Sequence, residues 1–206
     1  MANKNVALKV NVRDNTGYYP GQRTMKDNKI NRFLEIFKEK SFQRGSFTLA
    51  SGLESDYYCD AKLTTLDPEG AHLLAELILD RVEELGANCI GGLVVGATPI
   101  IGSVVKGAFE RGMSNLKGFY VRRDQKPHGM ERLIEGNVSR DDKVLIIDDV
   151  ITTGSSVSRV IKALKEKGCN NIVGVLCIFD RDEGTRDPEF EKYTVYSLLK
   201  KSDLFD

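Results

Sequence analysis

The fold is decided by one stretch, residues 144–156, which reads VLIIDDVITTGSS. Its first four residues are apolar and predict a buried strand, and Asp148 and Asp149 follow at the strand's carboxyl end. The next segment, 152–156, is small and hydroxylic around one glycine and leads directly into a predicted helix. Backbone N–H groups of such a loop, with the partial positive charge of a helix N-terminus, suit a phosphate group. Two nearby carboxylates suit vicinal hydroxyls, so the stretch predicts a site for a phosphorylated ribose.

Strands and helices alternate on both sides of this stretch. Apolar residues recur at i, i+3, i+4 and i+7 from Ile30 and again from Val157, which is the spacing of one helix face. Further helices are predicted from Pro68 to Gly86 and over 100–110, where Ile101, Val104, Val105 and Phe109 are expected to be buried. The other predicted strands are 89–95, 116–121, 172–179 and 193–198. This alternation predicts an α/β fold with a mostly parallel sheet, right-handed crossovers and a ligand crevice beyond the carboxyl ends of the strands.

Length and composition favour one soluble domain. The chain has 206 residues, 30 basic and 30 acidic side chains, and 41% hydrophobic residues. A net charge of zero argues against nucleic acid as a partner, and no apolar run is long enough to span a membrane. Four scattered cysteines and a start without a secretory signal predict a reduced, cytoplasmic protein. We expect residues 1–26 to form a partly disordered arm and residues 27–206 to form the domain.

Three more segments carry groups that suit the same ligand. Residues 122–129, RRDQKPHG, concentrate three cations and a histidine after a predicted strand. Residues 47–60 predict a hairpin with paired tyrosines, and Arg181 stands at the carboxyl end of the strand 172–179. Each also has a simpler explanation: a solvated surface loop, a packed hairpin, and an ion pair of Arg181 with Asp180 or Asp182.

These segments together resemble the orotate phosphoribosyltransferases of the type I phosphoribosyltransferase family. The stretch 148–156 resembles the family's loop for 5-phospho-α-D-ribose 1-diphosphate (PRPP), and RRDQKPHG resembles its flexible catalytic loop. The similarity spans about residues 27–200 and implies a small hood hairpin over the sheet. The PRPP-binding residues that it implies are Arg122, Arg123, Lys126, His128, Asp148, Asp149, Val150, Ile151, Thr152, Thr153, Gly154, Ser155 and Ser156. Among them the implied catalytic residues are Arg123, Lys126, His128, Asp148 and Asp149.

The resemblance also implies a base, a metal and an assembly. Orotate would contact Tyr57, Tyr58, Thr152 and Arg181. Mg²⁺ would be carried by PRPP rather than by protein side chains, and a homodimer would share its active sites between subunits. Two positions depart from the family pattern, because Ala50 and the segment 97–99, Ala-Thr-Pro, stand where many relatives have lysines. Lys62 is a candidate replacement for one of these cations.

Two other functions stay open on the sequence alone. The same scaffold serves phosphoribosyltransferases for purines or other pyrimidines, and only a panel of bases separates them. A PRPP-sensing regulator without catalysis would need a nucleic-acid-binding surface, which neither the length nor the charge of the chain suggests.

Overall fold

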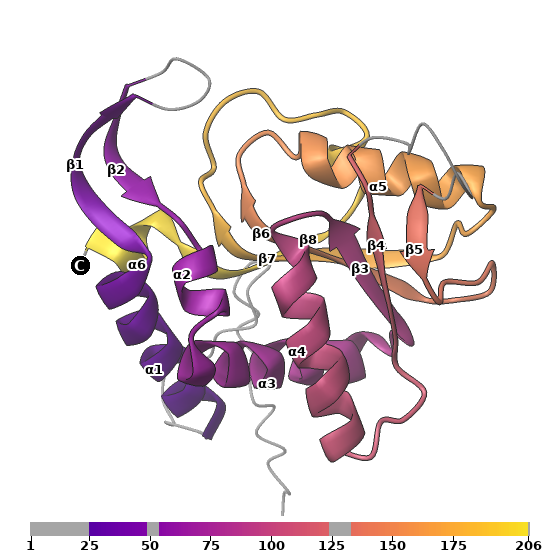
Figure 1. Cartoon of the computed structure of the whole chain (residues 1–206). Coiled ribbons are helices and arrows are strands. Elements are labelled where there is room, and N and C mark those ends of the chain that lie inside the picture. The colour runs from indigo at the N-terminus through magenta and orange to yellow at the C-terminus, as the bar shows by residue number, and fades with distance from the viewer. Residues whose placement is uncertain (1–24, 49–53, 124–132, 206) are drawn as a thin grey trace, which may run out of the picture.

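The computed structural model describes residues 25–48, 54–123 and 133–205. A six-stranded sheet in the order β5-β4-β3-β6-β7-β8 forms its centre (Figure 1). All neighbouring strands are parallel except β4 and β5, which are antiparallel. The strands are β3 (Cys89–Leu93), β4 (Lys117–Val121), β5 (Ile134–Gly136), β6 (Val144–Ile151), β7 (Ile172–Asp180) and β8 (Val195–Lys200). The predicted α/β class with a mostly parallel sheet is therefore confirmed.

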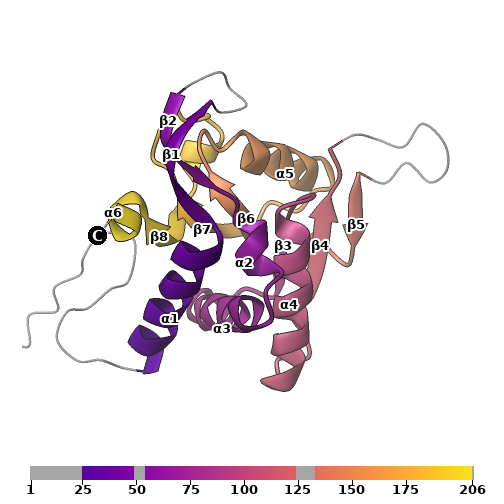
Figure 2. The same ribbon diagram turned by 60° about the vertical axis from the view of Figure 1, so that its left-hand side comes forward.

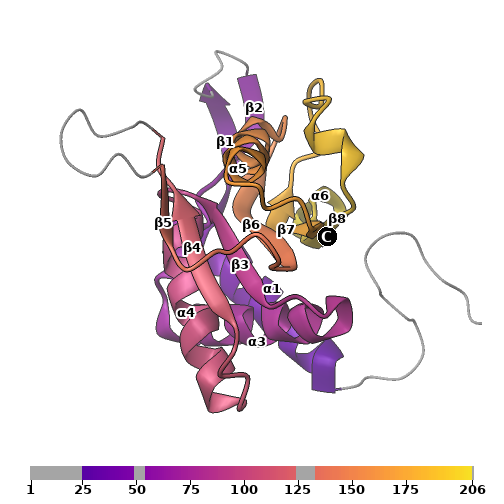
Figure 3. The ribbon, with the colours of Figure 1, turned by 90° about the vertical axis from the view of Figure 1, so that its right-hand side faces the viewer.

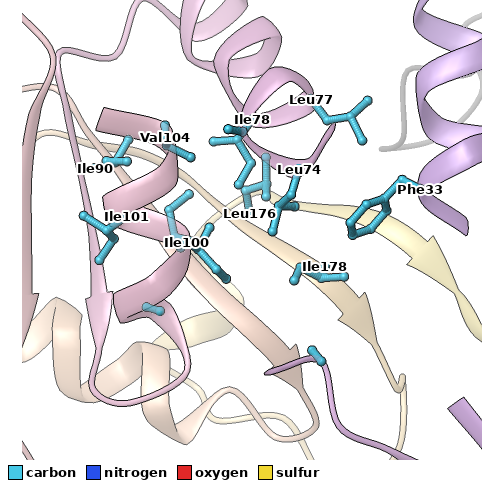
Figure 4. Packing of buried hydrophobic residues seen from close by; sticks show 14 of the residues in the cluster. Phe33, Leu74, Leu77, Ile78, Ile90, Ile100, Ile101, Val104, Leu176 and Ile178 are labelled. Atoms are coloured by element: carbon cyan, nitrogen blue, oxygen red, sulfur yellow. The ribbon is translucent and has the colours of Figure 1, made fainter. Parts of the chain in front are cut away.

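Helices cover both faces of this sheet (Figures 1 and 3). One apolar cluster joins α1 (Met25–Lys40), α3 (Pro68–Leu85) and α4 (Ala97–Glu110) to the strands, with Phe33, Ile78 and Ile178 fully buried (Figure 4). A second cluster packs α5 (Ser155–Glu166) against the other face. Each cluster takes alternate side chains of β6, since successive residues of a strand point to opposite faces. The short elements are α2 (Lys62–Thr65), the 3-10 turn η1 (Phe190–Lys192) and α6 (Lys201–Phe205).

Helix α3 begins and ends where the sequence predicted, and residues at both ends cap it. The Asp67 carboxylate accepts hydrogen bonds from the backbone N–H groups of Glu69 and Gly70, and Pro68 occupies the first turn. Gly86 ends the helix with a left-handed conformation, φ 62°. These caps satisfy backbone groups that the helix itself leaves open.

Three expectations from the sequence differ from the structure. Phe109 was expected in the core but is 77% exposed, because it follows the buried Ala108 on the outer side of α4. Strand β6 does not end at Ile147 but continues to Ile151, since Asp148 to Ile151 keep pairing with β7. The sequence predicted no strand between residues 121 and 144, yet Ile134–Gly136 forms the edge strand β5.

The predicted hairpin consists of β1 (Phe42–Thr48) and β2 (Glu54–Cys59), and it projects from the sheet at one edge (Figure 2). Hydrogen bonds from Tyr57 to Glu183 and from Arg181 to Ser55 join it to the segment after β7. The hairpin therefore lies beside the carboxyl ends of the central strands. Residues 1–24 lie outside the described residues, so the N-terminal arm stays a prediction. No helix in the described part of the chain is long and apolar enough to cross a membrane.

Candidate active site

Two adjacent carboxylates occupy the last half of β6. Asp148 pairs in register with Cys177 of β7 and is only 7% exposed, whereas Asp149 points to the other face and is half-buried. Burial raises the pKa of the Asp148 carboxyl, and the negative charge of Asp149 raises it further. Such a carboxylate is poorly solvated, so hydroxyl groups or cations of a ligand would stabilise its charged form.

The loop after β6 presents open backbone donors. Gly154 adopts φ 82° and starts α5, and among the described residues the N–H groups of Thr153, Gly154 and Ser156 have no hydrogen-bond partner. The Thr153 carbonyl accepts a hydrogen bond of 2.8 Å from the Asp187 N–H, which anchors the loop to the segment after β7. Open N–H groups at a helix N-terminus form an anion site, so the geometry matches the predicted phosphate loop.

The turn between β3 and α4 lies against the same carboxylates. A Cβ atom on Gly96 would be 2.5 Å from the Asp149 carboxyl carbon, and one on Gly92 would be 2.1 Å from the Ile147 carbonyl oxygen. Only glycine allows this approach at either position. The peptide bond between Val94 and Val95 is cis. The backbone of this turn therefore forms the second wall of the site.

The basic segment begins beside this wall. Arg123 donates a hydrogen bond of 3.3 Å from Nε to the Val94 carbonyl, and Arg122 forms an ion pair of 3.5 Å with Glu135. Both arginines follow β4, whose carboxyl end lies at the same sheet edge as those of β3 and β6. Lys126 and His128 lie outside the described residues, and their roles stay predictions.

Arg181 lies under the hairpin and is 7% exposed. Its guanidinium stacks 4.4 Å from the centre of the Tyr57 ring, and it donates hydrogen bonds of 3.2 Å to Glu183 and to the Ser55 hydroxyl. The simpler explanation offered for this residue, an ion pair with Asp180 or Asp182, is wrong. Those two carboxylates bind Arg186 instead.

The paired tyrosines point in opposite directions, as successive residues of a strand must. Tyr57 is fully buried and its hydroxyl donates to Glu183 at 3.1 Å, while Tyr58 is 44% exposed and packs against Phe47. The two rings therefore cannot lie on one face of the hairpin. Their predicted contact with a base remains a prediction, which for Tyr57 would require displacement of the groups that cover its ring.

Lys62 begins α2, just after the hairpin, and binds Asp60 at 2.6 Å. The pKa of Lys62 is raised mainly by its hydrogen bond to Asp60, with a smaller contribution from the charge of Asp149. This electrostatic link keeps Lys62 a candidate for the cation that Ala50 and the segment 97–99 do not supply. Ala50 itself lies outside the described residues.

Sequence reasoning missed two participants, Ser55 and Glu183. Both side chains contact Arg181. Ser55 is distant from it in sequence, and Glu183 lies on a loop without periodicity. A signal for Glu183 existed in the cluster of charges 180–183, but the sequence did not tell which carboxylate faces the arginine. Among the described residues, no group of three or more His, Cys, Asp or Glu side chains is placed to hold a metal ion.

Known proteins are similar to this chain in sequence and in fold. A family model described as the phosphoribosyl transferase domain matches residues 104–205. The orotate phosphoribosyltransferase of Pyrococcus horikoshii is 40% identical over 184 residues, which cover 88% of this chain and 94% of that protein. The enzyme of the same name from Aquifex aeolicus is 38% identical over 179 residues, which cover 85% of this chain and 96% of that protein.

Solved structures agree with these relatives. A phosphoribosyltransferase from Corynebacterium diphtheriae superimposes with a TM-score of 0.72 and 32% identity, over 87% of this chain and 99% of that one. The Mycobacterium tuberculosis orotate phosphoribosyltransferase in complex with PRPP gives a TM-score of 0.70 and 28% identity, over 86% of this chain and 99% of that one. The similarity is therefore to whole proteins rather than to a shared fragment.

Proposed function

Because the chain belongs to the orotate phosphoribosyltransferase family, we propose that it joins orotate to the ribose 5-phosphate of PRPP, releasing pyrophosphate and orotidine 5′-monophosphate. This is the reaction of de novo pyrimidine synthesis. The observation that carries the proposal is the pair Asp148 and Asp149 beside the open N–H groups of the loop, at 153, 154 and 156. Two carboxylates that can accept hydrogen bonds from vicinal hydroxyls, next to a loop that can bind an anion, fit a phosphorylated ribose and little else of similar size.

We assign a task to each part of the site. Asp148 and Asp149 accept hydrogen bonds from the ribose hydroxyls, and their negative charge stabilises positive charge that develops on the sugar. The loop 152–156, with Val150 and Ile151 fixed in β6 before it, holds the 5-phosphate and thereby positions C1. N1 of orotate forms a bond to C1 as the C1–O bond breaks, with the electron pair of that bond leaving on pyrophosphate, and the N1 proton passes to the departing pyrophosphate.

Cations neutralise the leaving group in this proposal. Arg122 and Arg123 stand at the start of the basic segment, and Lys126 and His128, which lie outside the described residues, would add to its positive charge. Arg181 pairs with the carboxylate of orotate, to which a planar guanidinium is complementary. Thr152 and the exposed Tyr58 would also contact orotate in this proposal.

Mg²⁺ is the proposed cofactor. PRPP would carry the ion into the site, because Mg²⁺ takes its ligands mainly from substrate phosphates and water rather than from a set of protein side chains. Bound with PRPP, the ion would offset negative charge on the pyrophosphate. Removal of divalent cations with a chelator should abolish turnover, and added Mg²⁺ should restore it.

We also propose a homodimer with shared sites, located in the cytoplasm. Val95, in the turn before α4, and Phe109, near the end of that helix, are 65% and 77% exposed, and a second copy would remove these two apolar side chains from water. Sharing is tested by mixing two inactive variants, Lys126→Ala and Asp149→Asn. Hybrid dimers regain turnover if each site takes Lys126 from one subunit and Asp149 from the other, and a mixture without activity refutes sharing.

A base panel tests the reaction itself. Pyrophosphate release from PRPP is measured with orotate, uracil, adenine, guanine and xanthine at equal concentration. We expect release with orotate alone. Turnover with a purine but not with orotate would replace the proposal by a purine enzyme, and absent turnover together with nucleic-acid binding would favour a regulator.

A further inference from the structure

Glu183 connects three separate parts of the fold. Its Oε1 accepts a hydrogen bond of 3.1 Å from the Tyr57 hydroxyl of the hairpin and one of 3.0 Å from Lys201 Nζ, at the start of α6. Its Oε2 accepts the bond of 3.2 Å from Arg181 Nε. One carboxylate therefore fixes the hairpin, the loop after β7 and the C-terminal helix to each other.

These contacts leave Arg181 in a single orientation. Glu183 holds Nε, the Ser55 hydroxyl holds one terminal nitrogen, and the Tyr57 ring supports the guanidinium plane. The other terminal nitrogen, Nη1, has no hydrogen-bond partner among the described residues and is not fully buried. Its donors are the part of Arg181 that a ligand can reach.

Lys201 keeps this group of residues positively charged. Arg181 and Glu183 alone would form a neutral pair with little attraction for an anion. Lys201 adds a second cation, bonded to Glu183 and lying 5.0 Å from the Tyr57 ring centre, so the three side chains carry a net formal charge of +1. Glu183 thus fixes the orientation of Arg181, and Lys201, which binds the same carboxylate, keeps the net charge of the group positive.

We infer that Glu183 is a positioning residue for base recognition: it orients Arg181 so that Nη1 faces the carboxylate of the base. The inference rests on the proposed function, because it takes orotate as the anionic base. Glu183 itself does not contact the substrate. A flexible arginine without this carboxylate would have to be ordered by the substrate, which weakens binding.

Steady-state kinetics of Glu183→Gln test the inference. Glutamine keeps the size of the side chain but removes the charge that binds Arg181 Nε. We expect the orotate KM to rise about tenfold, while the PRPP KM changes less than about twofold, since the PRPP loop makes no contact with Glu183. Glu69→Gln is the matched control, because Glu69 binds Arg32 through two hydrogen bonds away from the site, at 2.7 and 2.8 Å. It should leave both KM values unchanged.

Two further variants separate positioning from a general loss of structure. Ser55→Ala removes the other hydrogen bond to Arg181, and with it the bond of 2.8 Å that the Ser55 hydroxyl donates to the Tyr57 carbonyl. It should raise the orotate KM about threefold and lower the melting temperature only slightly. In an Arg181→Lys background, Glu183→Gln should alter the orotate KM less than about twofold, because the residue that it positions is gone.

The possible outcomes distinguish failure of the inference from failure of the proposed function. If the wild type turns over orotate and Glu183→Gln keeps the wild-type orotate KM, the inference is wrong and the proposed function stands. Equal increases in the KM values of orotate and PRPP would also overturn it, since they indicate a general disturbance of the site. A wild type that does not use orotate refutes the proposed function and the inference together.

Discussion

Replacing Gly154 with alanine should destabilise the protein by about 2–5 kcal/mol, because two penalties meet at this residue. The backbone has φ 82°, and a left-handed conformation costs a residue with a Cβ about 1–2 kcal/mol. The new Cβ would also lie 2.4 Å from Cγ and Cδ1 of the Phe190 ring, so the ring or the loop must move. Crowding of this kind costs about 1–3 kcal/mol in a packed interior.

Gly86→Ala is the matched control for the first penalty. Gly86 has φ 62°, and a Cβ there would meet no atom within 4 Å, so alanine should cost only about 1–2 kcal/mol. The difference between the two variants measures the clash with Phe190. In the Gly154→Ala background, Phe190→Ala should therefore cost less than it does in the wild type.

Denaturant unfolding followed by circular dichroism gives the free energy of unfolding for the wild type, the three single variants and the double variant. The PRPP KM of Gly154→Ala should also rise, because a displaced loop no longer aims its N–H groups at one phosphate. The reasoning is refuted if Gly154→Ala costs no more than Gly86→Ala. It is also refuted if the two changes at 154 and 190 are additive.

Asp148→Asn should lower kcat/KM at least a hundredfold and yet stabilise the free protein at neutral pH, measured by denaturant unfolding. The folded pKa of Asp148 is raised, so the wild type loses stability as the pH rises from about 3.9 through the folded pKa, and the variant should lack this loss. Lys126→Ala should lower kcat about a hundredfold with little change in PRPP binding, and single-turnover kinetics with unchanged rates would remove the basic segment from the mechanism. Glu76→Gln should cost about 1–2 kcal/mol at pH 7, because Arg111 and Lys29 lower the pKa of the Glu76 carboxyl to about 2. This contribution is complete above about pH 4.5 and disappears as the pH falls through 2, so the wild type and the variant should converge in acid unfolding curves.

Local patterns were sufficient for most of the fold. The helix from Pro68 could be predicted with both ends, because Asp67 and Gly86 satisfy its terminal groups by local chemistry. The central strand β6 and the helix after it could be predicted because apolar periodicity depends only on neighbours in sequence. Phe109 shows the limit of this reasoning: it was expected to continue the apolar stripe of α4, but the buried side of the helix runs through Val104 and Ala108, and the Phe109 ring is exposed.

The family, the α/β class and the carboxylate-and-loop unit at 148–156 could all be predicted, because each is recorded in residues that are adjacent in the chain. The groups that surround Arg181 could not be predicted, because they depend on how distant segments pack. Ser55 and Tyr57 reach it from a hairpin more than a hundred positions away, and Glu183 was one of three acidic candidates beside it. Side-chain partners at long sequence separation are set by how the layers pack, and no local pattern records that choice.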